Sequence, residues 1–332
     1  MSTSNEIRNL NYLNCSEVFE QNNSINSIKE IPKFIMLIGL PASGKSTLAE
    51  DLSKRYNANI HASDEIRKEL NTENYSKEKN QEVFSILHSR IKEDLRNYKS
   101  VIYDATNVNY KKRMAFLREL KSIPCKKVCY FKATPYETCL KRNSEREEKV
   151  PKYVIYNMYK NFDIPAYFEG WDTIHIIWDM KDMNKDFKNF QNLWEEMCKF
   201  DQHNSHHVLT LGEHCEKASK YFLDTRLYYA ALFHDCGKIE TASFVNSKGE
   251  VTEECHYYNH QYVSAYKALF YIRKYFSNED ILYVCQLIRW HMQPYFNDKN
   301  NKEKLDNKYK KLFGEDFWND LMKLHEADVA AH

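Results

Sequence analysis

The chain is 332 residues long, about two domains by the usual prior, and its 29% charged and 42% hydrophobic residues are those of an ordinary soluble protein. A net charge of +1 excludes the large basic field with which histone-like proteins and repressors grip long nucleic acids, although an enzyme that touches a few nucleotides needs no such field. The longest apolar run, residues 34–40, is far shorter than the roughly 18 residues of a membrane span, so we expect no membrane contact. The nine cysteines are scattered without CxxC spacing, which favours a reduced, cytoplasmic protein.

Residues 1–30 are polar and have neither a hydrophobic signal core nor an Arg-rich transit pattern, so we predict a loosely ordered leader there. From residue 34, short apolar strands alternate with longer amphipathic helices. We predict strands at 34–39, 58–62, 100–105, 127–132 and 173–178, and helices at 45–56, 64–71, 78–98, 109–121 and 135–146. This alternation predicts an α/β domain over residues 31–180, in which helices cover both faces of a parallel sheet.

The pattern changes after about residue 180, where only helix-period segments remain. We predict helices at 185–200, 206–222, 225–235, 259–276, 278–292 and 314–331, and no strand. Ten of the thirteen histidines lie at or after His203. We therefore predict a second, all-α domain over residues 181–332.

A phosphate-binding loop follows the first predicted strand. The sequence Gly-Leu-Pro-Ala-Ser-Gly-Lys-Ser at 39–46 matches GxxxxGK[ST], and it opens a predicted helix as this loop requires. We predict that ATP with Mg²⁺ binds here, through Gly39, Ser43, Gly44, Lys45, Ser46 and Thr47. Lys45 would reach the β- and γ-phosphates, and Ser46 would ligate Mg²⁺.

Other polar residues follow the predicted strands in an order that suits phosphate transfer. Asp64 and Arg67 lie one helical turn apart after the second strand, where a carboxylate could accept the proton of an attacking hydroxyl. Asp104 ends the third strand, at the sheet edge where ligands bind, and we assign it to Mg²⁺ with Ser46. Each has a plainer alternative, as a helix cap or an ordinary strand-end carboxylate.

Two arginines complete the predicted transfer site. Arg142 and Arg146 lie four residues apart on a predicted helix, so they would share a face and could close over the transferring phosphate. The alternative is a solvated helix face, because Glu145, Glu147 and Glu148 lie beside them.

Residues 34–179 resemble the bacteriophage-type polynucleotide kinase family. The resemblance rests on GLPASGKST, SDEIR, YDATN, RNSER and the Val-Pro…Glu-Gly pattern of residues 150–170. It implies transfer of the γ-phosphate of ATP to the 5′-hydroxyl of RNA or DNA. It also implies that Asp64 is the general base, that Arg67 contacts the acceptor-side phosphate, and that Arg142 and Arg146 form a lid. Small-molecule kinases and tRNA-linked kinases share much of this pattern.

The second half carries widely spaced metal-ligating residue types. The candidate ligands are His214, His234, Asp235, His260, His291 and Asp328, all on predicted helices, so only a helical bundle could bring them together. Imidazoles and carboxylates suit one or two divalent transition metals such as Mn, Co, Ni, Zn or Fe, with Asp235 bridging if there are two. Lys238 could offset phosphate charge in the transition state. We expect His203, His325 and His332 to be ordinary core or surface residues, and leave His206, His207 and His256 open.

Residues 204–332 resemble the HD superfamily of metal phosphohydrolases through LGEHC, LFHDCGK, YNHQ, IRWH and EADVAAH. The two resemblances together are those of a bifunctional polynucleotide kinase–phosphatase. They imply healing of RNA or DNA strand ends, RNA above all, with a nucleic-acid ligase acting downstream as a candidate partner. Two alternatives stay open: a metabolite or nucleoside kinase fused to a nucleotidase, and a kinase regulated by a nucleotide-sensing HD domain.

Overall fold

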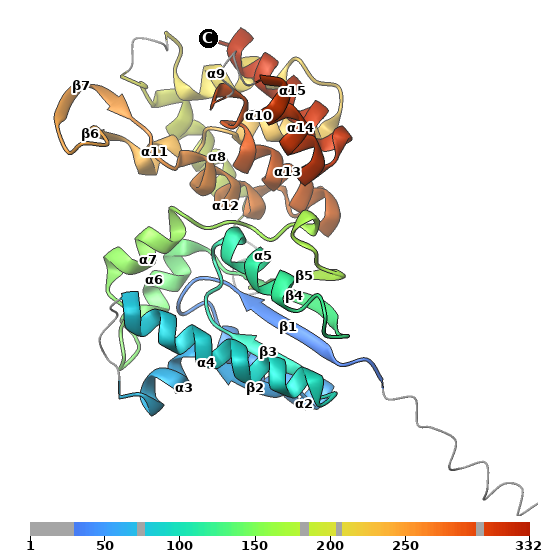
Figure 1. Cartoon of the computed structure of the whole chain (residues 1–332). Coiled ribbons are helices and arrows are strands. Elements are labelled where there is room, and N and C mark those ends of the chain that lie inside the picture. Colours follow the sequence, from blue (N-terminus) through green and yellow to red (C-terminus); the bar gives the residue numbers. More distant parts are fainter. Residues whose placement is uncertain (1–29, 72–76, 180–185, 204–207, 297–301) are drawn as a thin grey trace, which may run out of the picture. The chain divides into compact units, whose positions relative to one another are not determined.

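The computed structural model describes residues 30–71, 77–179, 186–203, 208–296 and 302–332, so the predicted leader lies almost entirely outside it. Five parallel strands form one sheet in the order β2-β3-β1-β4-β5 (Figure 1). The strands are β1 (Lys33–Ile38), β2 (Asn59–Ala62), β3 (Val101–Asp104), β4 (Lys126–Ala133) and β5 (Thr173–Trp178). All five were predicted, and the α/β class is confirmed.

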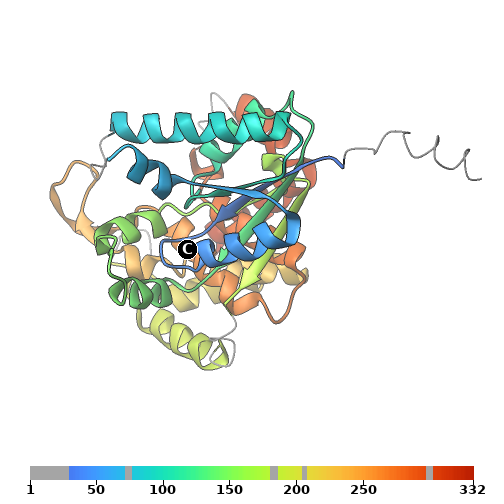
Figure 2. The same cartoon turned by 90° about the horizontal axis from the view of Figure 1, so that it is seen from below.

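Successive side chains of the central strand β1 point to opposite faces of the sheet, so they belong to two different parts of the hydrophobic core. Phe34 and Met36 pack with residues of α4 (Lys77–Arg96) and α5 (Tyr110–Glu119), whereas Ile35 packs with α2 (Lys45–Tyr56). Figure 2 shows α2 and α4 on opposite sides of the sheet. Because β1 is buried on both faces and is central in the sheet, the loop that follows it is held on a rigid support.

A buried ion pair fixes the segment that leads into β5. Arg113 donates from Nε and Nη2 to the two carboxylate oxygens of Glu169, at 2.7 and 2.6 Å, and both side chains are almost fully buried. The remaining elements of this half are α3 (Ser63–Glu69), α6 (Tyr136–Ser144), α7 (Lys152–Tyr159) and η1 (Tyr167–Glu169), of which α7 was not predicted. The Glu-Gly part of the sequence pattern therefore has a structural role here.

The second half is mainly helical, as predicted. Its elements are α8 (Asp186–Lys199), α9 (Leu211–Ser219), α10 (Thr225–Phe233), α11 (Lys238–Thr241), α12 (His260–Ile272), α13 (Asn278–Trp290), η3 (Pro294–Phe296), α14 (Lys302–Phe313) and α15 (Glu315–Ala330). The start of the helix predicted at 206–222 falls partly outside the described residues, and α14 was not predicted. No helix in the described ranges is long and apolar enough to cross a bilayer.

The expectation that no strand follows residue 180 is wrong. An antiparallel hairpin joins β6 (Ser243–Val245) to β7 (Val251–His256). Its turn is held by Asn246, whose side-chain oxygen accepts hydrogen bonds from the backbone of Lys248 and Glu250, at 2.9 and 3.0 Å. Such asparagine turns are a recognised signal of a hairpin. The signal was missed in the sequence analysis because the strands on both sides of the turn are short.

The two halves share one hydrophobic core, and residues Pro32–His332 group into a single compact unit. The hydroxyl of Tyr266, on α12, donates to the Thr134 carbonyl at 2.7 Å. Arg289 Nε, on α13, donates to Asp163 Oδ1 at 2.8 Å. The predicted boundary at residue 180 falls in 180–185, outside the described residues, so the division into domains at that point stays a prediction.

Candidate functional site

The loop between β1 and α2 has the backbone that a phosphate cradle needs. Gly44 lies at φ 94°, in the left-handed region that glycine tolerates best. A Cβ at Gly39 would lie 2.8 Å from Ser43 Oγ and 3.1 Å from the Lys132 carbonyl oxygen. The Gly39 N–H donates to the Thr106 carbonyl at 3.1 Å, which joins the loop to the end of β3. Both glycines of the sequence pattern are therefore required by the local geometry.

Lys45, Ser46 and Asp104 lie together at the carboxyl edge of the sheet. The ammonium of Lys45 is buried and donates to the Leu40 carbonyl at 2.8 Å. Burial lowers the pKa of Lys45, and the Asp104 carboxylate opposes this shift. Burial likewise raises the pKa of Asp104, against the effect of Lys45 and of a hydrogen bond from Ser46. This arrangement places a cation, a hydroxyl and a carboxylate beside the loop, as nucleotide binding with Mg²⁺ requires. Thr47, the next residue of α2, is exposed.

Asp64 lies near this group and remains open to solvent. Its side chain is 88% exposed, and its Oδ1 lies 4.0 Å from Arg67 Nε. Arg67 Nη2 also donates to Asn80 Oδ1, at 2.6 Å. The charge of Asp64 acts on the pKa of both Lys45 and Asp104, so it lies within electrostatic reach of the phosphate site. An exposed carboxylate at this position can meet an incoming hydroxyl group.

The prediction that Arg142 and Arg146 share a helix face is wrong in one respect. Helix α6 ends at Ser144, so Arg146 lies beyond it in a turn. Arg142 Nη1 lies 2.6 Å from the buried carboxylate of Asp179, which fixes its guanidinium. Burial, and to a smaller extent Arg146, lower the pKa of Lys45, so Arg146 still acts on the phosphate site. In its last turn, Ser144 Oγ donates to the Lys141 carbonyl at 2.6 Å.

Two residues of this half were missed by sequence reasoning. Lys132 lies beside both loop glycines, since its Cε would be 3.7 Å from a Cβ at Gly44. Burial lowers its pKa, and its ammonium lies 3.4 Å from the Trp178 carbonyl. Asp179 was missed as the partner of Arg142. The available signal for Lys132 was a lysine directly after the apolar run 128–131, at the carboxyl end of the strand.

All six candidate metal ligands of the helical half lie in one cluster. His214 comes from α9, the His234–Asp235 pair follows α10, His260 begins α12, His291 follows α13 and Asp328 comes from α15. Every one of these side chains is buried. The pair and His291 lie just past the ends of α10 and α13 and not within helices as predicted, although His234 and His291 keep right-handed helical backbone angles.

Hydrogen bonds to backbone carbonyls fix the protonation of three imidazoles. The Nδ1 atoms of His234, His260 and His291 each lie 2.7 Å from a carbonyl oxygen three residues earlier. A carbonyl only accepts, so each Nδ1 carries a proton, and Nε2 is the atom of each ring that can bind a metal ion. Those Nε2 atoms are directed into the cluster.

The Nε2 atoms meet in two pairs, His214 with His234 and His260 with His291, each 3.2 Å apart. Two nitrogens bound to one metal at about 2.0–2.1 Å lie about 2.8–3.0 Å apart in octahedral geometry and about 3.3–3.4 Å apart in tetrahedral geometry, and the observed separation lies between these values. For His260 and His291, both of which carry the proton on Nδ1, two lone pairs facing at this distance repel unless a cation lies between them. This donor geometry fits a metal.

Asp235 lies between the two histidine pairs. Its Oδ1 is 3.1 Å from His260 Nε2 and 3.5 Å from His291 Nε2, while its Oδ2 is 3.3 Å from His234 Nε2. Asp328 Oδ1 serves the first pair, at 3.0 Å from His214 and 3.2 Å from His234. Within the described residues, neither Asp235 Oδ1 nor Asp328 Oδ1 accepts a well-formed hydrogen bond. Buried carboxylate oxygens in this state suit metal coordination.

The electrostatics of the cluster also favour a bound cation. Burial disfavours the charged form of His234, yet Asp235 and Asp328 together raise its pKa well above the usual value. Burial also opposes ionisation of Asp235, but His234 and Lys238 hold its pKa well below the usual range. Lys238 Nζ lies 2.7 Å from Asp235 Oδ2 and donates to Gln202 Oε1 at 2.8 Å.

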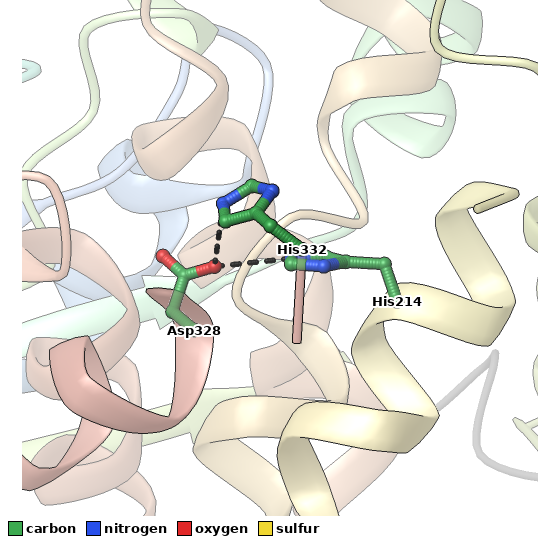
Figure 3. A group of neighbouring side chains, drawn as sticks. All are labelled: His214, Asp328 and His332. Atoms are coloured by element: carbon green, nitrogen blue, oxygen red, sulfur yellow. Dashed lines mark ion pairs between the residues drawn. The ribbon is translucent and has the colours of Figure 1, made fainter. Parts of the chain in front are cut away.

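His332 and Tyr295 were not predicted as part of this site. His332 Nε2 lies 3.8 Å from Asp328 Oδ1, and Figure 3 shows the rings of His214 and His332 directed toward that carboxylate. The Tyr295 hydroxyl donates to Asp328 Oδ2 at 2.9 Å. The four-residue spacing of Asp328 and His332 was the signal for the histidine. No comparable pattern marks Tyr295.

The remaining histidines of this half that the structure describes are not among these ligands, although His256 lines the same cavity as Asp235. His203 is 57% exposed at its side chain and lies 3.6 Å from Asp201. The ring of His325 packs edge-on against Tyr295, with the centroids 4.4 Å apart. His206 and His207 lie outside the described residues.

Comparisons with known proteins cover the first half of the chain. Residues 34–165 match the family model of the AAA domain. These residues form a P-loop domain that is similar to a domain of kinases. The chain is 34% identical over 155 residues to the L-seryl-tRNA(Sec) kinase of Methanococcus maripaludis, covering 44% of this chain and 58% of that protein. It is 26% identical over 152 residues to Protein kti12 of Schizosaccharomyces pombe, covering 42% and 54%.

The chain thus spans little more than half the length of these curated relatives. Among solved structures, the Pnkp1/Rnl/Hen1 RNA repair complex aligns with a TM-score of 0.35 at 22% identity, over 40% of this chain and 44% of that chain. A gluconokinase of Sinorhizobium meliloti 1021 aligns with a TM-score of 0.33 at 16% identity, over 45% and 83%.

Proposed function

We propose that this chain is a nucleic-acid end-healing enzyme that phosphorylates 5′-hydroxyl ends with ATP and removes 2′,3′-cyclic, 2′- or 3′-phosphates with bound metal. The observation that carries the proposal is the presence of two phosphate-directed sites in one chain. Lys45 beside Asp104 and Ser46 suits phosphate transfer from ATP, and the cluster around Asp235 suits metal-assisted hydrolysis. RNA cleavage leaves a 5′-hydroxyl and a 2′,3′-cyclic phosphate together, so RNA is the substrate that needs both activities.

In the proposed transfer, the acceptor oxygen bonds to the γ-phosphorus and the bond to the β–γ bridging oxygen breaks. Asp64 takes the acceptor proton, and ADP leaves. Lys45 stabilises the charge that develops on the phosphates, while Ser46 and Asp104 would hold Mg²⁺. Positive charge comes from Arg67 on the side of the acceptor, and from Arg142 and Arg146 on the side of the proposed lid.

In the proposed hydrolysis, the chain supplies the ligands of the metal and the ammonium group of Lys238. His214, His234 and Asp328 would hold one metal, and His260 with His291 would hold a second that shares Asp235. Bound metal would lower the pKa of a water and polarise the phosphate. Lys238, seated against Asp235, would neutralise the phosphate charge.

One sequence relative supports an RNA-linked acceptor. The relative from Methanococcus maripaludis is named as a kinase of L-seryl-tRNA(Sec). Its 34% identity favours a second candidate function, in which the acceptor is a hydroxyl carried on an aminoacylated tRNA. Phosphorylation of a 5′-hydroxyl oligonucleotide compared with seryl-tRNA separates the two candidates.

The test of the whole proposal is one synthetic RNA with a 5′-hydroxyl and a 2′,3′-cyclic phosphate. With γ-labelled ATP, Mg²⁺ and Mn²⁺, the full-length chain should transfer label to the 5′ end and open and release the terminal phosphate. Label transfer without phosphate release would remove the metal phosphohydrolase from the proposal. Transfer only to nucleosides or metabolites would replace the polynucleotide acceptor.

Asp64→Asn should keep ATP binding and lower kinase turnover by about 10²–10⁴-fold, the usual effect of a lost general base. The amide keeps the size of the side chain but cannot accept the hydroxyl proton. Turnover with a 5′-hydroxyl oligonucleotide and the Kd for ATP are the two measurements. Glu65→Gln, a change at the neighbouring exposed carboxylate, is the matched control and should leave turnover unchanged. Wild-type turnover in Asp64→Asn would make Asp64 a structural helix-start residue.

A further inference from the structure

A cavity of about 820 Å³ opens beside the metal-ligand cluster. It is lined by Asp235, Lys238, His260 and Asp328 of the cluster, which we call its floor, and by the end of β7 and the residues that follow it. Pockets for organic ligands measure roughly 300–1,000 Å³, so this space exceeds what a phosphate group alone would occupy. Something larger than phosphate fits beside the floor.

We propose that this cavity binds the nucleoside of the phosphorylated substrate, with the base stacked on Tyr258 and the phosphate at the Asp235–Lys238 floor. The proposal rests on the proposed phosphohydrolase function and names its substrate class. Aromatic stacking suits a nucleoside because every base has a π-face. The unpredicted hairpin would then be the element that selects the substrate.

Tyr258 has the geometry of a stacking platform. Its side chain is 44% exposed, yet its ring is fixed: it lies parallel to that of His256, with centroids 5.5 Å apart and planes at 16°. Its hydroxyl accepts a hydrogen bond from the Ser247 backbone N–H at 3.0 Å, across the hairpin. An exposed ring held at two points loses little conformational entropy when a base stacks on it.

The other aromatic residues of the cavity support the floor. The Tyr257 hydroxyl donates to the Gln202 carbonyl, and its ring lies 5.3 Å from Lys238 Nζ. The Tyr295 hydroxyl donates to Asp328. Lys238 thus lies over the Tyr257 ring, and the Tyr295 ring packs at 90° against His325, so Tyr258 is the tyrosine suited to the base.

Tyr258 is close in sequence to one of the candidate metal ligands. Tyr258 precedes the metal ligand His260 by only two residues, and Asn259 between them adopts φ 69°. This left-handed turn lets His260 point into the cluster while Tyr258 stays on the hairpin side of the cavity. A phosphate at the floor and a base at Tyr258 would thus be held by one short segment.

Steady-state hydrolysis by the full-length chain with Mn²⁺ tests the proposal. The substrates are a nucleoside 3′-monophosphate, a 3′-phosphorylated tetranucleotide and glycerol 2-phosphate, which has no ring. Tyr258→Ala should raise KM for both nucleotides by about 5–100-fold, the usual range for one lost stacking contact, and leave glycerol 2-phosphate unchanged. Tyr258→Phe should keep the low KM. Tyr221→Ala, which removes an exposed tyrosine that does not line the cavity, is the matched control.

Equilibrium binding of the same mononucleotide gives a readout that does not need turnover. If the chain hydrolyses none of the substrates but binds the nucleotide, and Tyr258→Ala weakens that binding, the hydrolytic function fails and the nucleoside site stands. If the wild type hydrolyses glycerol 2-phosphate as readily as nucleotides, or Tyr258→Ala binds like wild type, the nucleoside site is overturned. A lower KM for the tetranucleotide identifies a strand end as the source of the nucleoside, and equal KM values identify free nucleotide.

Discussion

Lys45→Ala should lower phosphate transfer from ATP by at least about 10²–10³-fold while the metal-dependent hydrolysis of phosphate ends continues. The Lys45 ammonium is buried in the loop and bonded to the Leu40 carbonyl, so it is fixed where the β- and γ-phosphates would lie. Its charge stabilises the transferring phosphoryl group, and alanine leaves that charge uncompensated.

The measurement compares both activities of the same purified preparation. Lys54→Ala, at an exposed position near the end of the same helix, is the matched control and should change neither. Circular dichroism and the melting temperature check that the variant is folded. Equal loss of kinase and hydrolase activity in a folded Lys45→Ala protein would contradict the two-site proposal.

Asp235→Asn should lower both bound metal and phosphate release, the latter by at least about 10²-fold. Asp235 lies within 3.5 Å of the Nε2 atoms of His234, His260 and His291, so its charge serves both histidine pairs. An amide is a weaker ligand and lacks the negative charge that attracts a divalent cation. Elemental analysis of the full-length protein, alongside phosphate release, is the measurement.

Two further variants separate ligand loss from other effects. Lys238→Ala should keep the metal and lose hydrolysis, because the ammonium acts on the phosphate. His203→Ala removes an exposed histidine outside the cluster and should change neither quantity. A metal-free protein that still hydrolyses, or Asp235→Asn with full metal and full activity, would remove the metal phosphohydrolase from this account.

The fold was largely predictable because its strongest signals are local. Five apolar strands of four to eight residues, with a glycine-rich loop after the first, leave few alternatives to a parallel P-loop sheet. The short hairpin was missed because β6 has three residues and its stability depends on the Asn246 turn more than on strand pattern. The periodicity of hydrophobic residues does not reveal a turn that is held by hydrogen bonds to the side chain of Asn246.

The candidate site residues also fall into those that a local sequence pattern reveals and those that only the fold brings together. Gly39–Ser46 and the His234–Asp235 pair carry recognisable spacing, so the sequence alone singles them out as candidates. Lys132 and Tyr295 reach their sites through the fold alone, as a strand lysine beside the loop and a hydroxyl beside Asp328. Arg146 was placed on α6 because periodicity does not reveal where the last turn of a helix ends.

The hydrophobic core that the two halves share determines how the protein unfolds. Tyr266 belongs to the helical half, yet its ring packs against Phe131 and Phe162 of the sheet half, with centroids 6.5 and 4.8 Å apart. Burying one such side chain contributes roughly 1.5–3 kcal/mol, so a cut between the halves would expose apolar surface on both fragments. Heating should therefore melt both halves in one cooperative transition, and a destabilising substitution on either side of the interface should lower a single common Tm.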